Sequence, residues 1–439
     1  MTAPVYLLKI ELDNIRCFGD KAILDLSDDN GNWKKWTIIL GNNGTGKTTL
    51  LKAIALFELE KNQSAPQTKS LLNSPKMKNV YSFDENHFSV REFSKDDKKI
   101  CVTLSKNINS LGKIDSNKLS INYKRDGHVE SSATSVEDDI ELKIFGYGAN
   151  RFMDNMGGSP HSTFGANSET LFNDDAKLIN AEEWLIQLDY AASKDSEVKE
   201  FAEKKRNQVK EILLDLLPDI QDIRFTTPTK ENLNSTVEFK TDYGFWVTIH
   251  QLSLGYKTMV AWTVDLAARM FQRYSESDHP LEESAIVLVD EIDLHLHPKW
   301  QRKIFEHLSN KFPKTQFIVT AHSPLIVQSA PQNANIVLLK KEGNYVVIDN
   351  DIKSVRNWRL DQIMSSDLFG DSARNPEIEK WLFERKVLLQ KKELSSEEAK
   401  RLRELNEKAH ALPTADNPED IEAMEIIRNA ADYLKTKKA

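Results

Sequence analysis

The chain has 439 residues, of which 40% are hydrophobic and 29% are charged, and its formal net charge is −8 at pH 7. These values are typical of a water-soluble globular protein large enough for more than one lobe, and the negative charge excludes a polybasic nucleic-acid sleeve. No apolar run reaches the roughly 18 residues of a membrane span, and two cysteines without a basic N-terminal signal segment predict a reducing, cytoplasmic location.

The N-terminal part predicts two strands and a helix. Residues 5–12 and 36–40 predict strands, and the second is an apolar run typical of a buried parallel strand. Residues 47–60 carry apolar side chains at helical spacing and predict a helix directly after that strand.

The stretch 61–140 predicts a lobe inserted after this helix. Residues 61–90 are polar and broken by proline, which is typical of a long loop. Residues 98–107 and 117–131 alternate apolar and polar side chains, as in an antiparallel hairpin with one wet face. Residues 60–125 contain 13 lysines and arginines against 7 acidic residues. A solvated face is the simpler explanation of this excess, and a nucleic-acid contact is the alternative.

The remaining elements alternate between helices and buried strands. Residues 141–151 predict a strand, and residues 171–220 have a helical pattern. The elements predicted after them are strands at 236–240, 245–250, 284–291 and 315–322, a helix after residue 253, a helix at 298–312, and three or four helices from about residue 353.

The stretch GNNGTGKTT lies between the strand at 36–40 and the following helix, and it matches the P-loop pattern G-x-x-x-x-G-K-[ST] in the context that this pattern requires. Backbone N–H groups freed by the glycines can wrap a phosphate chain at the helix N-terminus. We expect Lys47 to reach the β- and γ-phosphates and the Thr48 hydroxyl to coordinate Mg²⁺. The predicted nucleotide-binding residues of this loop are Gly41, Asn42, Asn43, Gly44, Thr45, Gly46, Lys47, Thr48 and Thr49.

An acidic pair follows a later apolar strand in the arrangement of a Walker B motif. Asp290 is predicted to order Mg²⁺, and Glu291 to polarise the attacking water. His322 ends another buried strand; such a histidine is usually structural, but after a Walker B motif it is a candidate γ-phosphate contact. His295 and His297 alternate as zinc ligands can, yet no cysteine or third histidine lies nearby in sequence, so zinc is the weaker hypothesis.

The stretch HQLSLGYKTMVAW lies between the P-loop and the acidic pair. Taken alone, Ser253 is a plain N-cap of an amphipathic helix. The order of P-loop, LSLG, acidic pair and strand-end histidine resembles the ABC-type ATPases, and more closely their SMC/RecF/OLD-like branch. Their signature is L-S-G-G-Q. Ser253 and Gly255 match its serine and second glycine, whereas Leu254 and Tyr256 replace the first glycine and the glutamine.

Other segments extend the resemblance over most of residues 5–335. LLKIELDNIRCF, EIDLHLHPKWQ and QFIVTAHSP resemble the OLD-type AAA family, and FGYGANR is similar to a segment of the PtuA-type ATPase subunits of Septu and retron-linked antiphage systems. No SMC-type coiled coil and no Toprim nuclease pattern is found.

The resemblance implies ATP and Mg²⁺ as cofactors and at least a homodimer, in which two heads enclose ATP between the P-loop of one and the signature of the other. Ser253 and Gly255 would then bind the γ-phosphate held by the partner. Further residues that the resemblance places at the nucleotide or the dimer interface are Arg16, Asn150 or Arg151 as substitute for the Q-loop glutamine, and Asp293 at the start of the D-loop.

We therefore expect an α/β fold, a P-loop NTPase head of the ABC type with a mixed central sheet flanked by helices and an antiparallel β-lobe. The predicted parts are 1–170 as ATPase lobe I with an insertion at about 61–140, 171–230 as a helical segment, 231–350 as ATPase lobe II, and 351–439 as a C-terminal helical domain.

The resemblance also implies a cellular role, a defence ATPase that regulates a separate effector such as an HNH or Toprim-type nuclease or a toxin. The apolar residues of 381–389 are a candidate docking surface for that effector, although packing within the chain explains them more simply. One alternative is a RecF-like DNA-repair ATPase that contacts DNA through residues 60–125. Another is a nucleotide-gated scaffold or sensor with little turnover, against which the intact Glu291 and His322 argue.

Overall fold

The computed structural model describes residues 4–19, 21–61, 98–106, 115–123, 129–134, 142–153, 167–230, 233–352, 358–364, 366, 368–369, 375–391 and 395–410. The chain divides into two compact units, Met1–Phe369 and Gly370–Ala439. Among the helices of these described ranges, none is long and apolar enough to cross a membrane. The finer division into four parts stays a prediction.

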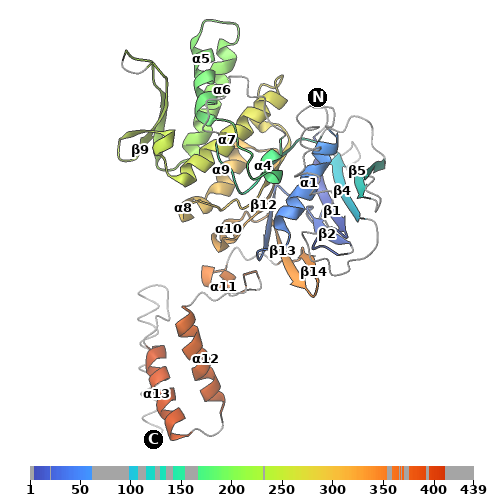
Figure 1. The fold of residues 1–439 in the computed structure, drawn as a ribbon, viewed down its shortest axis with the longest axis vertical. Coiled ribbons are helices and arrows are strands. Elements are labelled where there is room, and N and C mark those ends of the chain that lie inside the picture. Colours follow the sequence, from blue (N-terminus) through green and yellow to red (C-terminus); the bar gives the residue numbers. More distant parts are fainter. Residues whose placement is uncertain are drawn as a thin grey trace. The chain divides into compact units, whose positions relative to one another are not determined.

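A six-stranded sheet forms the centre of the first unit (Figure 1). Its strands in spatial order are β14 (Tyr345–Asp349), β13 (Asn335–Glu342), β3 (Trp36–Gly41), β12 (Thr315–Thr320), β11 (Ala285–Val289) and β7 (Ile144–Tyr147). All neighbours are parallel except β14, which pairs antiparallel with β13 at one edge. The strands β3, β11 and β12 are buried along almost their whole length, because both faces of the sheet are covered.

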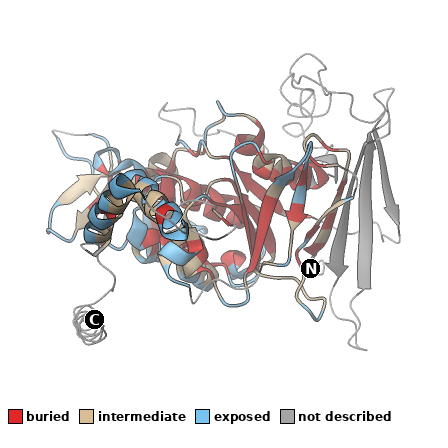
Figure 2. Ribbon diagram, turned by 90° about the horizontal axis from the view of Figure 1, so that it is seen from below, coloured by how far each residue is buried: buried red, intermediate tan, exposed pale blue. Residues whose placement is uncertain are grey.

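The two faces of this sheet belong to two hydrophobic cores. Because successive side chains of a strand point to opposite faces, Ile38 of β3 lies in one core and Ile39 in the other. The longer helices of the first core are α5 (Ala181–Ser193), α6 (Lys199–Leu216), α7 (Leu254–Arg273) and α9 (Ile304–Lys311). The second core contains α1 (Lys47–Lys61) and the short α4 (Glu169–Phe172). Figure 2 shows the buried residues concentrated on the sheet and on the helices that pack against it.

An antiparallel five-stranded sheet confirms the predicted β-lobe. Its order is β2 (Ala22–Asp25), β1 (Tyr6–Asp13), β4 (Lys98–Lys106), β5 (Asp115–Tyr123) and β6 (Val129–Thr134). The predicted segment 117–131 therefore spans parts of two strands. Beyond Lys61, the predicted loop at 61–90 lies outside the described residues.

A small third sheet precedes α7. It consists of β10 (Trp246–Thr248), β9 (Val237–Thr241) and β8 (Ile220–Phe225), all antiparallel. The remaining short elements of the first unit are the 3₁₀ helices η1 (Ile249–Gln251) and η2 (Pro280–Glu282) and the helices α8 (Pro298–Gln301), α10 (Pro324–Ser329) and α11 (Leu360–Met364).

The single helix predicted at 298–312 is wrong, because the structure divides it into α8 and α9. At the break, the Lys303 N–H donates to the Trp300 carbonyl, three residues back rather than the four of an α-helix. The Gln301 side chain donates to the Leu296 carbonyl at 3.0 Å, which ties the break to the loop after β11. A periodicity of apolar side chains gives no information about such a side-chain bond.

Within its described residues, the second unit contains the helices α12 (Pro376–Gln390) and α13 (Ser396–His410). The predicted capping signal SSEE is confirmed, because the Glu398 N–H donates to Ser395 Oγ at 3.2 Å and the Ser395 N–H donates to a Glu398 carboxylate oxygen at 2.9 Å. Arg401 of α13 makes two hydrogen bonds to Glu384 of α12, at 2.9 and 3.0 Å. The last predicted helix, after residue 416, lies outside the described residues.

Candidate functional site

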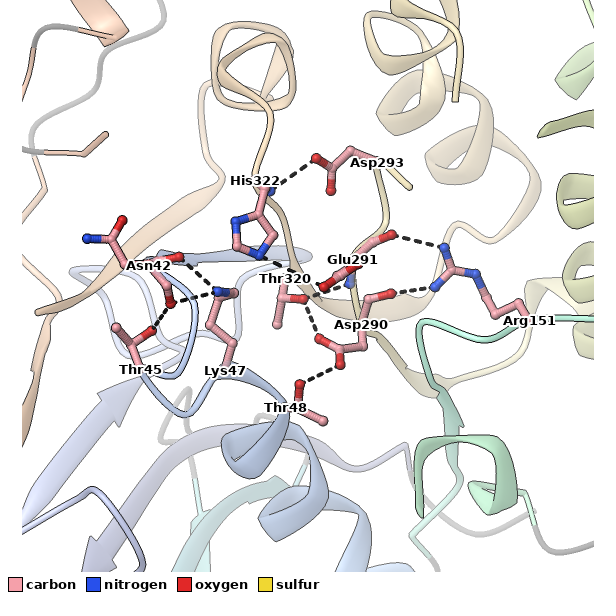
Figure 3. Close-up of polar contacts among 11 residues, drawn as sticks. Asn42, Thr45, Lys47, Thr48, Arg151, Asp290, Glu291, Asp293, Thr320 and His322 are labelled. Carbon is pink, nitrogen blue, oxygen red and sulfur yellow. Dashed lines mark hydrogen bonds and ion pairs between the residues drawn. The ribbon is translucent and has the colours of Figure 1, made fainter. Parts of the chain in front are cut away.

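The predicted site residues meet at the carboxyl edge of the central sheet. The P-loop follows β3, His322 follows β12, the acidic pair follows β11, and Asn150 follows β7. Since these strands are parallel neighbours, their carboxyl ends lie side by side, where open α/β sheets bind ligands. Figure 3 shows the P-loop, the acidic pair and His322 around one site, although Thr48 and Asp290 are 242 residues apart in sequence.

The P-loop has the backbone that its glycines permit. Gly46 has φ +87°, and a Cβ there would lie 2.4 Å from the Cys17 sulfur, so both conformation and space require glycine. The Thr45 hydroxyl donates to the Asn42 carbonyl at 2.8 Å, which holds the turn closed. The loop leads directly into α1, which begins at Lys47, so the loop presents its N–H groups at a helix N-terminus.

Lys47 is held inside this loop. Its Nζ donates to the carbonyls of Gly41 at 2.8 Å and Asn42 at 3.1 Å. The side chain is buried, and burial lowers the pKa of Lys47, while the carboxylates of Asp290 and Glu291 act in the opposite direction. A cation in this setting attracts an anion strongly because little water screens it.

A chain of short hydrogen bonds joins the P-loop to the acidic pair. The Thr48 hydroxyl donates to Asp290 Oδ2 at 2.6 Å, and the Thr320 hydroxyl donates to Asp290 Oδ1 at 2.6 Å. The Thr320 oxygen in turn accepts the Glu291 N–H at 2.7 Å. Thr320, the last residue of β12, was not predicted; its only signal in the sequence is a hydroxyl at the end of a buried strand.

The donor set of this junction fits Mg²⁺. Thr48 and Asp290 present a hydroxyl and a carboxylate, the hard oxygen ligands that Mg²⁺ prefers, next to a loop shaped for phosphate. By contrast, His295 and His297 are exposed, and His297 caps α8 by accepting the Lys299 N–H at 3.3 Å. In the described parts of the chain, no three histidine, cysteine or acidic side chains cluster as metal ligands.

Glu291 and His322 face each other across the edge of the sheet. His322 Nε2 lies 3.9 Å from Glu291 Oε1, and both side chains are about one-third exposed, at 37% and 36%. The His322 N–H donates to Asp293 Oδ2 at 3.1 Å, which fixes the loop after β12 against the loop after β11. The Glu291 carboxylate is therefore both accessible and close to a titratable partner.

The segment of the predicted signature begins α7. Ser253 occupies the predicted N-cap position of α7, and its side chain makes no capping hydrogen bond. Leu254 is 47% exposed. Gly255 is buried, and a Cβ there would lie 2.4 Å from the His295 carbonyl oxygen. Glycine at 255 thus lets the start of α7 pack on the loop that follows the acidic pair.

The remaining predicted residues have different surroundings. Arg16 Nη1 donates to Thr49 Oγ1 at 3.5 Å, which places the guanidinium at the first turn of α1; burial lowers the pKa of Arg16. Asn150 is exposed at the end of β7. Arg151 is buried and points to the main chain of the acidic pair, and burial lowers its pKa to about 10.

Sequence reasoning also missed a buried ion pair behind the site. Arg269 Nε donates to Asp265 Oδ2 at 2.6 Å, and both residues belong to α7. The Tyr147 hydroxyl at the end of β7 donates to the same carboxylate oxygen at 3.0 Å. In the sequence, the spacing of four residues between Asp265 and Arg269 was the signal for an ion pair on one helix face. That the pair is buried depends on the position of β7.

Comparison with known proteins gives a family match over most of this site. The family model described as "AAA domain, putative AbiEii toxin, Type IV TA system" matches residues 37–328, a range that contains the P-loop, the LSLG segment, the acidic pair and His322.

Two relatives match across most of the chain. The Septu protein PtuA of Bacillus mycoides (strain KBAB4) is 28% identical over 389 residues, which are 88% of this chain and 47% of that protein. The chain thus spans about half the length of this relative. The retron Vc95 probable ATPase of Vibrio cholerae serotype O1 biovar El Tor is 28% identical over 375 residues, 73% of this chain and 71% of that protein.

A solved structure is also similar. The crystal structure of the Smc head bound to the C-winged helix domain of ScpA aligns with a TM-score of 0.47 and 18% identity, over 78% of this chain and 96% of that one.

Proposed function

Because this chain belongs to the AAA family of ATPase domains that matches its residues 37–328, we propose that it binds Mg·ATP and hydrolyses it between two copies of itself. The observation that carries the proposal is the hydrogen-bond chain from Thr48 through Asp290 and Thr320 to the Glu291 N–H. It joins a phosphate-binding loop to a metal-binding carboxylate and a potential general base within one rigid junction.

The roles of the P-loop side follow from these contacts. The Lys47 ammonium exchanges its P-loop carbonyl partners for phosphate oxygens, and Thr48 and Asp290 hold Mg²⁺. Mg²⁺, when bound, neutralises phosphate charge and orients the phosphate chain. The N–H groups at the start of α1 supply the remaining donors, and Arg16 adds positive charge at the same helix turn.

Glu291 and His322 serve the hydrolytic step in this proposal. The Glu291 carboxylate orients a water molecule and accepts its proton, and the exposed part of the side chain leaves room for that water. His322, 3.9 Å from the carboxylate, contacts the γ-phosphate and reports whether it is intact. Asn150, exposed at the neighbouring strand end, is proposed to take the place of the Q-loop glutamine.

The second copy completes the site through Ser253 and Gly255. The Ser253 hydroxyl makes no capping bond within its own helix, and the Leu254 side chain lies on the surface beside it. This arrangement supports a role for the free end of α7 in binding a phosphate held by a partner. Asp293, bonded to the His322 N–H, connects the same interface to the γ-phosphate contact.

A Glu291→Gln substitution tests the hydrolytic assignment. We expect phosphate release to fall by about 10²–10⁴-fold, the usual effect of losing a general base. ATP binding, measured with a fluorescent analogue, remains, and the ATP-bound dimer accumulates in light scattering. Glu306→Gln, an exposed change on α9, is the matched control and keeps wild-type turnover. A Glu291→Gln protein that releases phosphate at the wild-type rate contradicts the proposal.

We further propose a cytoplasmic antiphage role in which ATP turnover regulates a separate effector, an HNH or Toprim-type nuclease or a toxin. Support comes from the similarity to a Septu protein and a retron ATPase. In the second unit, Phe383 and Leu389 are 70% and 54% exposed, so α12 offers apolar surface for such a partner. Affinity purification from the native host in the presence of ATP identifies the effector.

The RecF-like alternative depends on residues 60–125, whose side chains lie almost entirely outside the described part of the chain. It is distinguished by turnover that rises with DNA and falls steeply as salt increases, because phosphate contacts release counterions. Turnover insensitive to DNA favours the effector-regulating role.

A further inference from the structure

Arg151 lies beside the site and has no role in the proposed hydrolysis so far. The residue is 3% exposed, and its guanidinium donates to three main-chain carbonyls. Nη1 donates to Gly148 at 3.0 Å and to Asp290, and Nη2 donates to Glu291 at 2.9 Å. A buried arginine directed at two consecutive carbonyls, those of the acidic pair, constrains backbone rather than ligand (Figure 3).

Glu291 needs such a constraint. Its φ is +49°, in the left-handed region that non-glycine residues rarely adopt. Such a conformation persists only where the surroundings over-determine it. Here the Thr320 hydroxyl accepts the Glu291 N–H, and the Arg151 guanidinium donates to its carbonyl and to the preceding one. Both sides of the strained residue are therefore held, one by β12 and one by the segment after β7.

The end of β7, just before this segment, contacts the helix of the LSLG motif. Tyr147, four residues before Arg151, donates to the buried Asp265 of α7, which also pairs with Arg269. Because α7 begins at the surface assigned to the partner's phosphate, its backbone and these hydrogen bonds join that surface to the backbone of Glu291.

We infer that Arg151 is a positioning residue for hydrolysis, which sets the backbone of Glu291 so that its carboxylate faces the attacking water. The inference rests on the proposed function, since it assigns a supporting residue to the proposed base. It differs from a Q-loop role, because the guanidinium contacts the main chain behind the acidic pair and Asn150 is the exposed neighbour.

Arg151→Lys keeps the charge but cannot form the fork to both carbonyls. We expect kcat for ATP hydrolysis to fall about 10–100-fold, the usual effect of removing a supporting contact in a site. KM and the equilibrium binding of a fluorescent ATP analogue stay within about threefold, because Lys47 and Thr48 are untouched. Arg302→Lys, an exposed arginine between α8 and α9, is the matched control with wild-type kinetics.

A double-mutant cycle distinguishes a positioning role of Arg151 toward Glu291 from a general loss of structure in the site. If Arg151 acts through Glu291, then Arg151→Lys has no further effect on kcat in a Glu291→Gln background. An equal fold-loss in both backgrounds overturns the inference, as does a wild-type kcat in the single variant. Inactive wild-type protein instead contradicts the proposed function itself.

A measurement without nucleotide gives an independent readout. In hydrogen exchange, we expect faster exchange in Arg151→Lys for the peptide that spans 285–296, relative to a peptide from α6. Unchanged exchange there, or a uniform rise across the whole first unit, contradicts a local positioning role. Arg151→Met is a second variant. We expect a larger increase in exchange in the same peptide, because methionine has no hydrogen-bond donor in its side chain.

Discussion

At the scale of single residues, Thr320 connects the two acidic residues, because its hydroxyl forms hydrogen bonds to both of them. Thr320→Val removes the donor to Asp290 and the acceptor for the Glu291 N–H while keeping the side-chain volume. We expect a loss of about 1–3 kcal/mol in the free energy of unfolding, the cost of unpaired buried polar groups. Urea denaturation measures it.

Thr315→Val, on the same strand, is the control for this change. The Thr315 hydroxyl is buried and has no hydrogen-bond partner, so its removal is expected to be neutral or stabilising. Equal losses in the two variants would show that the hydroxyl of Thr320 is not what matters.

At the scale of elements, the start of α7 and the loop after β11 behave as one packed unit. Gly255→Ala places a Cβ 2.4 Å from the His295 carbonyl oxygen, which backbone movement must relieve. We expect a loss of about 1–3 kcal/mol in unfolding free energy, the usual cost of overpacking, with a matching loss of turnover. Leu254→Ala, one residue earlier on the surface, keeps the stability of the wild type; denaturant titration of both variants makes the comparison.

Elements also show what the sequence could predict and what it could not. The P-loop and the acidic pair were predictable because their chemistry needs fixed local spacing, and their strands are apolar runs. The contacts of Thr320 and Arg151 could not be predicted, because they depend on the order of strands in the sheet. β12 lies between β3 and β11, and β7 lies beside β11. The break between α8 and α9 was missed for a different reason, because it accompanies a side-chain bond from Gln301 to the Leu296 carbonyl, five residues back, which helical periodicity does not register.

At the scale of the whole molecule, two inactive variants test the shared site. Ser253→Arg is expected to abolish hydrolysis but spare ATP binding, and Lys47→Met to lose phosphate binding. If the site is shared, equal mixing restores about a quarter of wild-type turnover, since half of the dimers are mixed and one of their two sites is intact. Phosphate release from the mixture measures this. No recovery above the separate variants means that each copy works alone.

The position of β12 has a further geometric consequence. It separates the strand of the P-loop from the strand of the acidic pair, so their ends are about two inter-strand spacings, or roughly 10 Å, apart. That spacing is set by the backbone hydrogen bonds of β12 to both neighbours, and side chains such as Thr48 and Asp290 bridge it. The distance between the two strand ends is therefore a property of the sheet. A single substitution can change which side chains meet at this edge, whereas the distance between the strand ends depends on the pairing of β12 with β3 and β11.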